Sequence, residues 1–69
     1  MRIYTVTKAD QPLAVVRAAN RAEAIATALA LGAAGSHDGL DVRDPNDAEM
    51  VGWIERREDY AVTEHTAIA

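Results

Sequence analysis

The sequence contains no cysteine and no phenylalanine, and it has a single tryptophan. The absence of cysteine excludes both a disulfide framework and a zinc site built on thiolates. No apolar run reaches about 18 residues, the length that a membrane-spanning helix needs. The first residues also lack the basic region, apolar stretch and cleavage site of a signal peptide. We therefore expect a cytoplasmic protein.

Bulky apolar side chains are scarce. Apolar residues make up 49% of the 69-residue chain, but 15 of them are alanine. Few large side chains give a thin core, and a chain of this length is marginally stable without cross-links. The length allows one domain at most, so we expect residues 1–69 to fold as a single domain.

The charge is acidic and unevenly distributed. The formal net charge is −4. Residues 1–35 carry four basic and two acidic side chains, whereas residues 36–69 carry three basic and nine acidic ones. Such asymmetry bears on partners and on electrostatic steering rather than on the fold.

The first half of the chain predicts a hairpin followed by a helix. Residues 2–7 and 13–19 alternate in polarity and contain β-branched residues, which is typical of strands, and residues 8–12 predict the turn. Asn20 is expected to cap a helix over residues 21–31, with Glu23 completing a capping box and Gly32 ending the helix. The predicted apolar stripe of this helix consists of Ala22, Ile25, Ala26 and Leu29.

The second half predicts shorter elements. Residues 40–43 are either a short strand or extended chain, and a last strand is expected from Tyr60 to Ile68. Between them, Asp44 is expected to cap a second helix, with Pro45 at its first position and Asp47 in its first turn. The predicted apolar side of this helix consists of Met50, Val51 and Ile54, with Trp53 at its edge. The fold class is therefore α+β, a small antiparallel sheet with two helices on one face.

No catalytic or metal-binding motif is present. Ser36, His37 and Asp38 are adjacent in the chain, and the side chains of a hydrolase triad must converge from separate elements. The glycines at 32 and 35 follow a helix, whereas a phosphate loop precedes one. His37 and His65 have no metal-ligand spacing. We expect neither an enzyme nor a cofactor or metal site.

The acidic segment and the single tryptophan are the candidate functional features. Carboxylates recur every third residue from Asp38 to Asp47. One interpretation is helix capping and a solvated face; the other is an anionic surface that imitates a phosphate backbone. Trp53 is either part of the core or an exposed interface anchor. The predicted partner-binding residues are Asp38, Asp41, Glu49, Trp53, Glu55, Glu58 and Asp59.

One resemblance adds to this interpretation. The strand pattern Ile3-Tyr4-Thr5-Val6 and the segment from Val15 to Asn20 run directly into Arg21-Ala22-Glu23-Ala24-Ile25. This pattern resembles the start of many small proteins of phages and mobile elements. A short acidic chain without a catalytic motif is also similar to the anti-CRISPR proteins that block type I interference complexes. The resemblance implies a bacterial host and binding to a basic surface of a Cas subunit.

The sequence thus leads to two functional hypotheses. The first is an anti-CRISPR-like inhibitor whose acidic surface blocks a nucleic-acid site on a Cas effector by DNA mimicry. The alternative is an antitoxin-like or regulatory protein-interaction module of a mobile element. Both involve a protein partner, without direct binding to nucleic acid or a membrane. A monomer is favoured because like charges repel, with a homodimer as the alternative through open strand edges.

Overall fold

The N-terminal hairpin forms as the sequence predicts. In the computed structural model, which describes residues 1–62, β1 (Arg2–Lys8) pairs with β2 (Gln11–Ala18) in antiparallel register. The connection is a two-residue turn in which Ala9 and Asp10 have left-handed φ angles of 50° and 65°. A turn of this kind matches the twist of the two strands, although left-handed backbone is unfavourable for alanine. The register shifts after Val6, where the hairpin contains a bulge.

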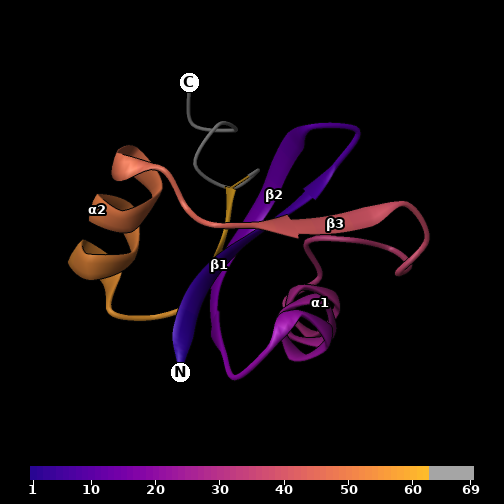
Figure 1. Ribbon diagram of the computed structural model, residues 1–69, viewed down its shortest axis with the longest axis horizontal. Helices are drawn as coiled ribbons and strands as arrows, with labels where there is room; N and C mark the ends of the chain where they lie inside the picture. Colours follow the sequence, from indigo (N-terminus) through magenta and orange to yellow (C-terminus); the bar gives the residue numbers. More distant parts are fainter. Residues whose placement is uncertain (63–69) are drawn as a thin grey trace.

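Two short strands extend the hairpin into a four-stranded antiparallel sheet with the order β3-β1-β2-β4 (Figure 1). β3 (Leu40–Arg43) pairs with β1, and β4 (Tyr60–Ala61) pairs with β2. The middle segment is therefore a strand. The predicted last strand begins at Tyr60 as expected, and its residues 63–68 lie outside the described part of the chain. The α+β class with a small antiparallel sheet is confirmed.

Helix α1 (Arg21–Ala30) begins at the predicted cap. The side chain of Asn20 accepts a hydrogen bond from the Glu23 N–H at 2.9 Å. The Glu23 carboxylate turns back to the N–H of Ala19, at 3.3 Å, rather than to that of Asn20. At the other end Gly32 has a φ of +77°, the left-handed conformation expected after a helix.

The face of α1 that packs on the sheet differs from the predicted stripe. Ala24 and Ala28 are fully buried, whereas Ala22 and Ala26 are exposed. Ile25 is only partly buried beside the core. The prediction placed the bulkiest side chains inward, but alanines one turn apart let the helix backbone approach the sheet closely. The buried core consists of Tyr4, Val6, Ala14, Val16, Ala18, Ala24, Ala28 and Val42.

Helix α2 (Asp47–Arg56) begins later than predicted, because Asn46 and not Asp44 is its cap. The Asn46 side chain accepts a hydrogen bond from the Glu49 N–H at 2.8 Å, and the Glu49 carboxylate accepts one from the Asn46 N–H at 2.9 Å. This reciprocal pair satisfies two free backbone donors at once. Asp44 instead forms an ion pair with Arg2 at 3.1 Å.

The predicted apolar side of α2 is only partly covered. Val51 and Ile54 are 53% and 56% exposed, although both were expected to face the core. Met50 and Trp53 are half-buried. The one buried side chain of this helix is Glu49, which the sequence analysis had placed on a partner-binding surface.

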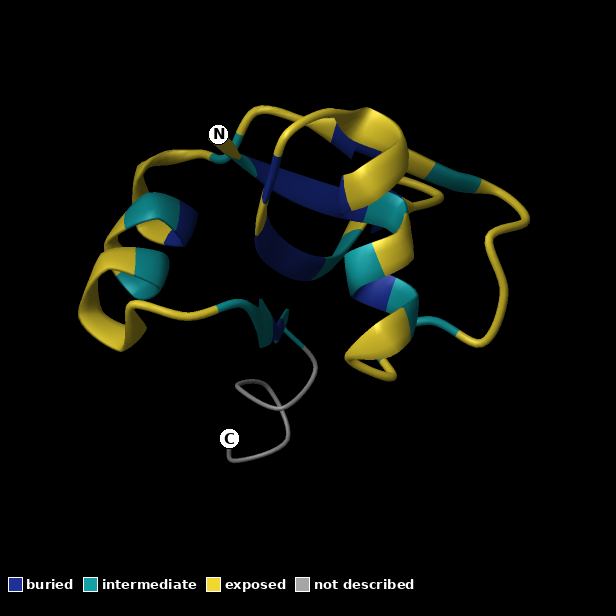
Figure 2. Ribbon diagram, turned by 90° about the horizontal axis from the view of Figure 1, so that it is seen from below, coloured by how far each residue is buried: buried dark blue, intermediate teal, exposed yellow. Residues whose placement is uncertain are grey.

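The two helices contact the sheet through different residues of β1. Side chains alternate along a strand, so Tyr4 and Val6 project to one face and Thr5 to the other. Helix α1 packs on the first of these faces, whereas Glu49 of α2 is hydrogen-bonded to Thr5. The buried strands accordingly lie between the two helices in Figure 2.

Candidate protein-interaction surface

Glu49 is fixed inside the structure by four hydrogen bonds. Its Oε1 atom accepts from the Thr5 hydroxyl at 2.9 Å, from the Asn46 N–H at 2.9 Å and from the Arg43 guanidinium at 2.8 Å. Its Oε2 atom accepts from the same guanidinium at 2.9 Å. Only 8% of Glu49 is exposed. Glu49, one of the predicted partner-binding residues, is therefore not accessible to a partner, because the sheet and the helix cap already occupy its carboxylate.

The surroundings of Glu49 keep it ionised. Burial alone would raise the pKa of this carboxyl, but the hydrogen bonds from Arg43, the Asn46 amide and Thr5, together with the charge of Arg43, outweigh burial and hold the pKa below its ordinary value. The same hydrogen bond raises the pKa of Arg43. A buried carboxylate with this many donors is a structural group.

Asp59 links Trp53 of α2 to the sheet. The Asp59 carboxylate accepts a hydrogen bond from the backbone N–H of Arg17 at 2.7 Å and from the Trp53 indole N–H at 3.3 Å. Asp59 and Trp53 are both half-buried. Trp53 therefore belongs to the packing between α2 and the segment that leads into β4.

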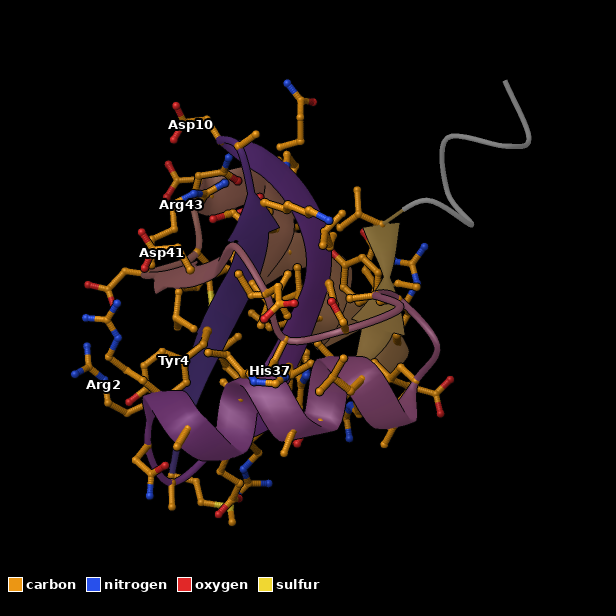
Figure 3. The ribbon with its side chains drawn as sticks, turned by 90° about the vertical axis from the view of Figure 1, so that its right-hand side faces the viewer. Arg2, Tyr4, Asp10, His37, Asp41 and Arg43 are labelled. Carbon is orange, nitrogen blue, oxygen red and sulfur yellow. The ribbon has the colours of Figure 1, made fainter. Side chains whose placement is uncertain are left out.

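Asp41 lies at the outer edge of β3 and is also engaged. Its carboxylate accepts a hydrogen bond from the Arg21 guanidinium at 2.8 Å and another from the Val42 N–H at 2.8 Å. Asp41 and Arg43 lie on the same side of the molecule as Arg2 and Tyr4 (Figure 3). A hollow of about 310 Å³ is lined there by Arg2, Tyr4, Arg21 and Arg43 among others.

The arginines of that hollow are balanced by carboxylates of the same chain. Arg2 pairs with Asp44, Arg21 with Asp41, and Arg43 with Glu49. The first two of these pairs join the basic N-terminal half to the acidic C-terminal half. The charge asymmetry of the sequence is thus partly cancelled by folding.

The other predicted residues are accessible. Asp38, Glu55 and Glu58 are exposed, and within residues 1–62 their carboxylates make no hydrogen bond or ion pair. Asp47, in the first turn of α2, is also exposed, and its carboxylate likewise makes no hydrogen bond or ion pair within these residues. Three of these four carboxylates belong to α2 or to the turn that follows it. Among these four, the accessible carboxylates are therefore concentrated around α2, with Asp38 apart from them in the loop before β3.

A groove runs beside α2 next to these carboxylates. It has a volume of about 380 Å³, and its lining includes Ala48, Val51, Gly52, Glu55 and Tyr60. Apolar periodicity did not predict this groove, because it places Val51 in the core. The only sequence signal for it is Gly52, an unfavourable residue inside a helix.

Gly52 allows the Tyr60 ring to approach the helix. A β-carbon at position 52 would lie 2.5 Å from the Tyr60 hydroxyl oxygen. That hydroxyl donates a hydrogen bond to the Glu49 carbonyl oxygen at 3.3 Å, and burial raises its pKa above the ordinary value. The Arg56 guanidinium lies 4.3 Å from the centre of the ring. These contacts fix one wall of the groove.

Other kinds of site find no support in the described residues. Between residues 1 and 62, no three His, Cys, Asp or Glu side chains come together where they could hold a metal ion. Over the same residues, neither helix has the length and apolar character needed to cross a bilayer. No protein-family model, curated protein or solved structure matches this chain.

Proposed function

We propose that this chain is an inhibitory binding protein of the anti-CRISPR type, whose acidic surface occupies a nucleic-acid-binding groove of a Cas effector complex. The observation that carries the proposal is the set of exposed carboxylates at α2, formed by Asp47, Glu55 and Glu58, which make no hydrogen bond or ion pair within residues 1–62. Charged groups that are not used for folding remain available to a basic partner.

The acidic surface that supports this proposal is smaller than the sequence alone suggested. Glu49, Asp59 and Asp41 each accept hydrogen bonds within the chain, so removing their charge would disturb the fold as well as any interface. The free carboxylates at α2 and in the loop at Asp38 are the groups that can imitate phosphates. A groove that binds DNA carries lysines and arginines, which would pair with them.

The test is a competition experiment with a purified type I effector complex. The chain should bind the effector and displace double-stranded DNA from it, and binding should weaken as salt rises, because surface charges are screened over about 10 Å at 0.1 M salt. Charge reversal of Glu55 and Glu58 together should weaken binding by about tenfold, since each surface pair contributes up to about 1 kcal/mol.

A matched pair of variants with the same net charge separates the position of a charge from its sum. Asp10 is an exposed carboxylate in the hairpin turn, so Asp10→Asn and Glu55→Gln each remove one negative charge, from the turn and from α2 respectively. Equal weakening by both variants would mean that only the net charge matters and would contradict a defined surface. Binding to a toxin protein in place of any effector would favour the alternative of an antitoxin-like module.

A further inference from the structure

We infer that the outer face of α2 and the groove beside it form a docking site for a basic amphipathic helix of a partner protein. This inference rests on the proposed function and specifies the chemistry that the partner presents at this surface. It requires an apolar contact at the centre of the interface in addition to charge.

The apolar centre consists of Val51 and Ile54. Residues three positions apart lie on the same face of a helix. Among residues 1–62 the exposed large apolar side chains are Met1, Leu31, Val51 and Ile54, and only the last two share an element. A pair of half-exposed aliphatic side chains on one helix face is a small apolar patch that a partner can cover.

Carboxylates flank this patch along the helix axis. Asp47 precedes Val51 by one turn, and Glu55 follows it by one turn. Glu58 comes just after the helix and is exposed.

Of the nearby cations, Arg56 lines the groove, where its guanidinium lies over the Tyr60 ring. Arg57 is the left-handed C-cap residue, where a positive charge interacts with the helix end. The face around Val51 and Ile54 thus combines apolar surface with negative charge, which complements lysines or arginines beside apolar residues.

The groove continues the apolar patch on one side. Val51 borders both, and Ala48, Gly52 and Tyr60 line the groove, whose volume of about 380 Å³ can take an aliphatic side chain. Its wall is held in place because the Tyr60 ring packs directly on Gly52. A preformed groove lowers the entropy cost of binding.

These features favour a partner helix over a nucleic acid or a partner strand. A nucleic acid would be repelled by the flanking carboxylates and has no aliphatic side chain to offer the groove. A partner strand added to β3 would have to displace two hydrogen bonds. The Leu40 N–H donates to the His37 carbonyl oxygen, and the Val42 N–H donates to the Asp41 carboxylate. A basic amphipathic helix satisfies both the apolar patch and the carboxylates, as in other helix-in-groove complexes.

The inference can be tested with a synthetic amphipathic peptide that has leucines on one helical face and lysines on the other. Amide chemical shifts of the full chain should change at residues 47–56 and not along α1. A control peptide with glutamate in place of lysine should bind at least about tenfold more weakly. Shifts spread over the whole surface, or equal binding of both peptides, would overturn the inference.

Two pairs of variants separate the apolar and the charged contributions. Val51→Ser combined with Ile54→Ser should weaken binding of the lysine peptide by about tenfold, whereas Leu31→Ser, a change at another exposed apolar residue, should leave it unchanged. Glu55→Gln should weaken binding more than Asp10→Asn. Circular dichroism of each variant checks that the fold is retained. Full binding by the folded Val51 and Ile54 variant would disprove the apolar centre.

The same variants distinguish this inference from the proposed function. If the Val51 and Ile54 variant binds an effector normally while the Glu55 and Glu58 reversals do not, the proposed function holds and the docking site is wrong. If no effector binds but the lysine peptide docks at α2 with the expected variant effects, the docking site holds and the proposed function is wrong.

Discussion

The hydroxyl of Thr5 on β1 donates a 2.9 Å hydrogen bond to the carboxylate of Glu49 on α2, and this bond joins residues 44 positions apart in the chain. The same carboxylate accepts two hydrogen bonds from Arg43, in β3. Since Val51 and Ile54 are exposed, this polar contact is one of the links that hold α2 to the sheet.

Removal of the Glu49 side chain should therefore destabilise the protein strongly. Glu49→Ala leaves the Thr5 hydroxyl and the Arg43 guanidinium without their acceptor, and we expect a loss of about 2 kcal/mol or more in the free energy of unfolding. Urea denaturation measures this loss. The control is Glu55→Ala on the same helix, which should change the stability by less than about 0.5 kcal/mol. Similar effects of both changes would contradict a structural role for Glu49.

The contribution of Glu49 should also depend on pH. Its pKa in the folded protein lies below the ordinary value of 4.5, so its stabilising effect is fully present above the ordinary pKa and is lost as the pH falls through the lowered one. We expect wild type to be more stable than Glu49→Gln at pH 7, and this difference to shrink at about pH 3. Urea denaturation at both pH values tests this. An unchanged difference would show that protonation of Glu49 has no part in acid destabilisation.

Gly52 should not tolerate alanine, in spite of the gain in helix propensity of about 1 kcal/mol that alanine normally brings. The added β-carbon would meet the Tyr60 hydroxyl at 2.5 Å, so the ring or the helix must move. We expect Gly52→Ala to lower the stability of wild type, and to cost less when Tyr60 is changed to phenylalanine. A double-mutant cycle by thermal unfolding measures the coupling between the two positions. Independent effects of the two changes would contradict the contact.

The carboxylate of Asp59 should protect the edge of β2. It accepts the hydrogen bond of the Arg17 N–H at 2.7 Å, in the part of the strand that lies beyond the two-residue pairing with β4. In Asp59→Ala we expect faster amide exchange at Arg17 and more self-association at high concentration, because free strand edges pair with other chains. Hydrogen exchange and light scattering provide the measurements, with the neighbouring exposed change Glu58→Ala as the control. Unaltered exchange at Arg17 would rule out this protection.

Local signals in the sequence predicted the hairpin and the start of α1, and they left residues 40–43 open between a short strand and extended chain. Each depends on residues close together in the chain, such as Asn20 and Glu23 at the helix start. The start of α2 was misplaced because Asp44 and Asn46 are both suitable caps. The choice between them depends on Glu49, whose carboxylate completes the box only with Asn46.

The candidate site was harder to predict, because hydrophobic periodicity assumes that apolar side chains face the core. In α2 that assumption fails, since the buried carboxylate of Glu49 is stabilised by Thr5, a partner distant in sequence. The acidic run likewise contained two kinds of carboxylate that look the same in sequence. Those of Asp41 and Asp59 bind backbone N–H groups, whereas those of Glu55 and Glu58 remain accessible.

The hairpin turn offers a practical route to separating loss of binding from loss of folding. Ala9 and Asp10 adopt left-handed backbone without a glycine, and the sequence Asn-Gly suits such a turn better, with a gain of about 1 kcal/mol for relieving one such residue. The turn lies at the tip of the hairpin, at the far end of β1 from Arg2 (Figure 3). A chain with Ala9→Asn and Asp10→Gly would provide a stabilised background in which disruptive substitutions in α2 could be studied while the protein remains folded.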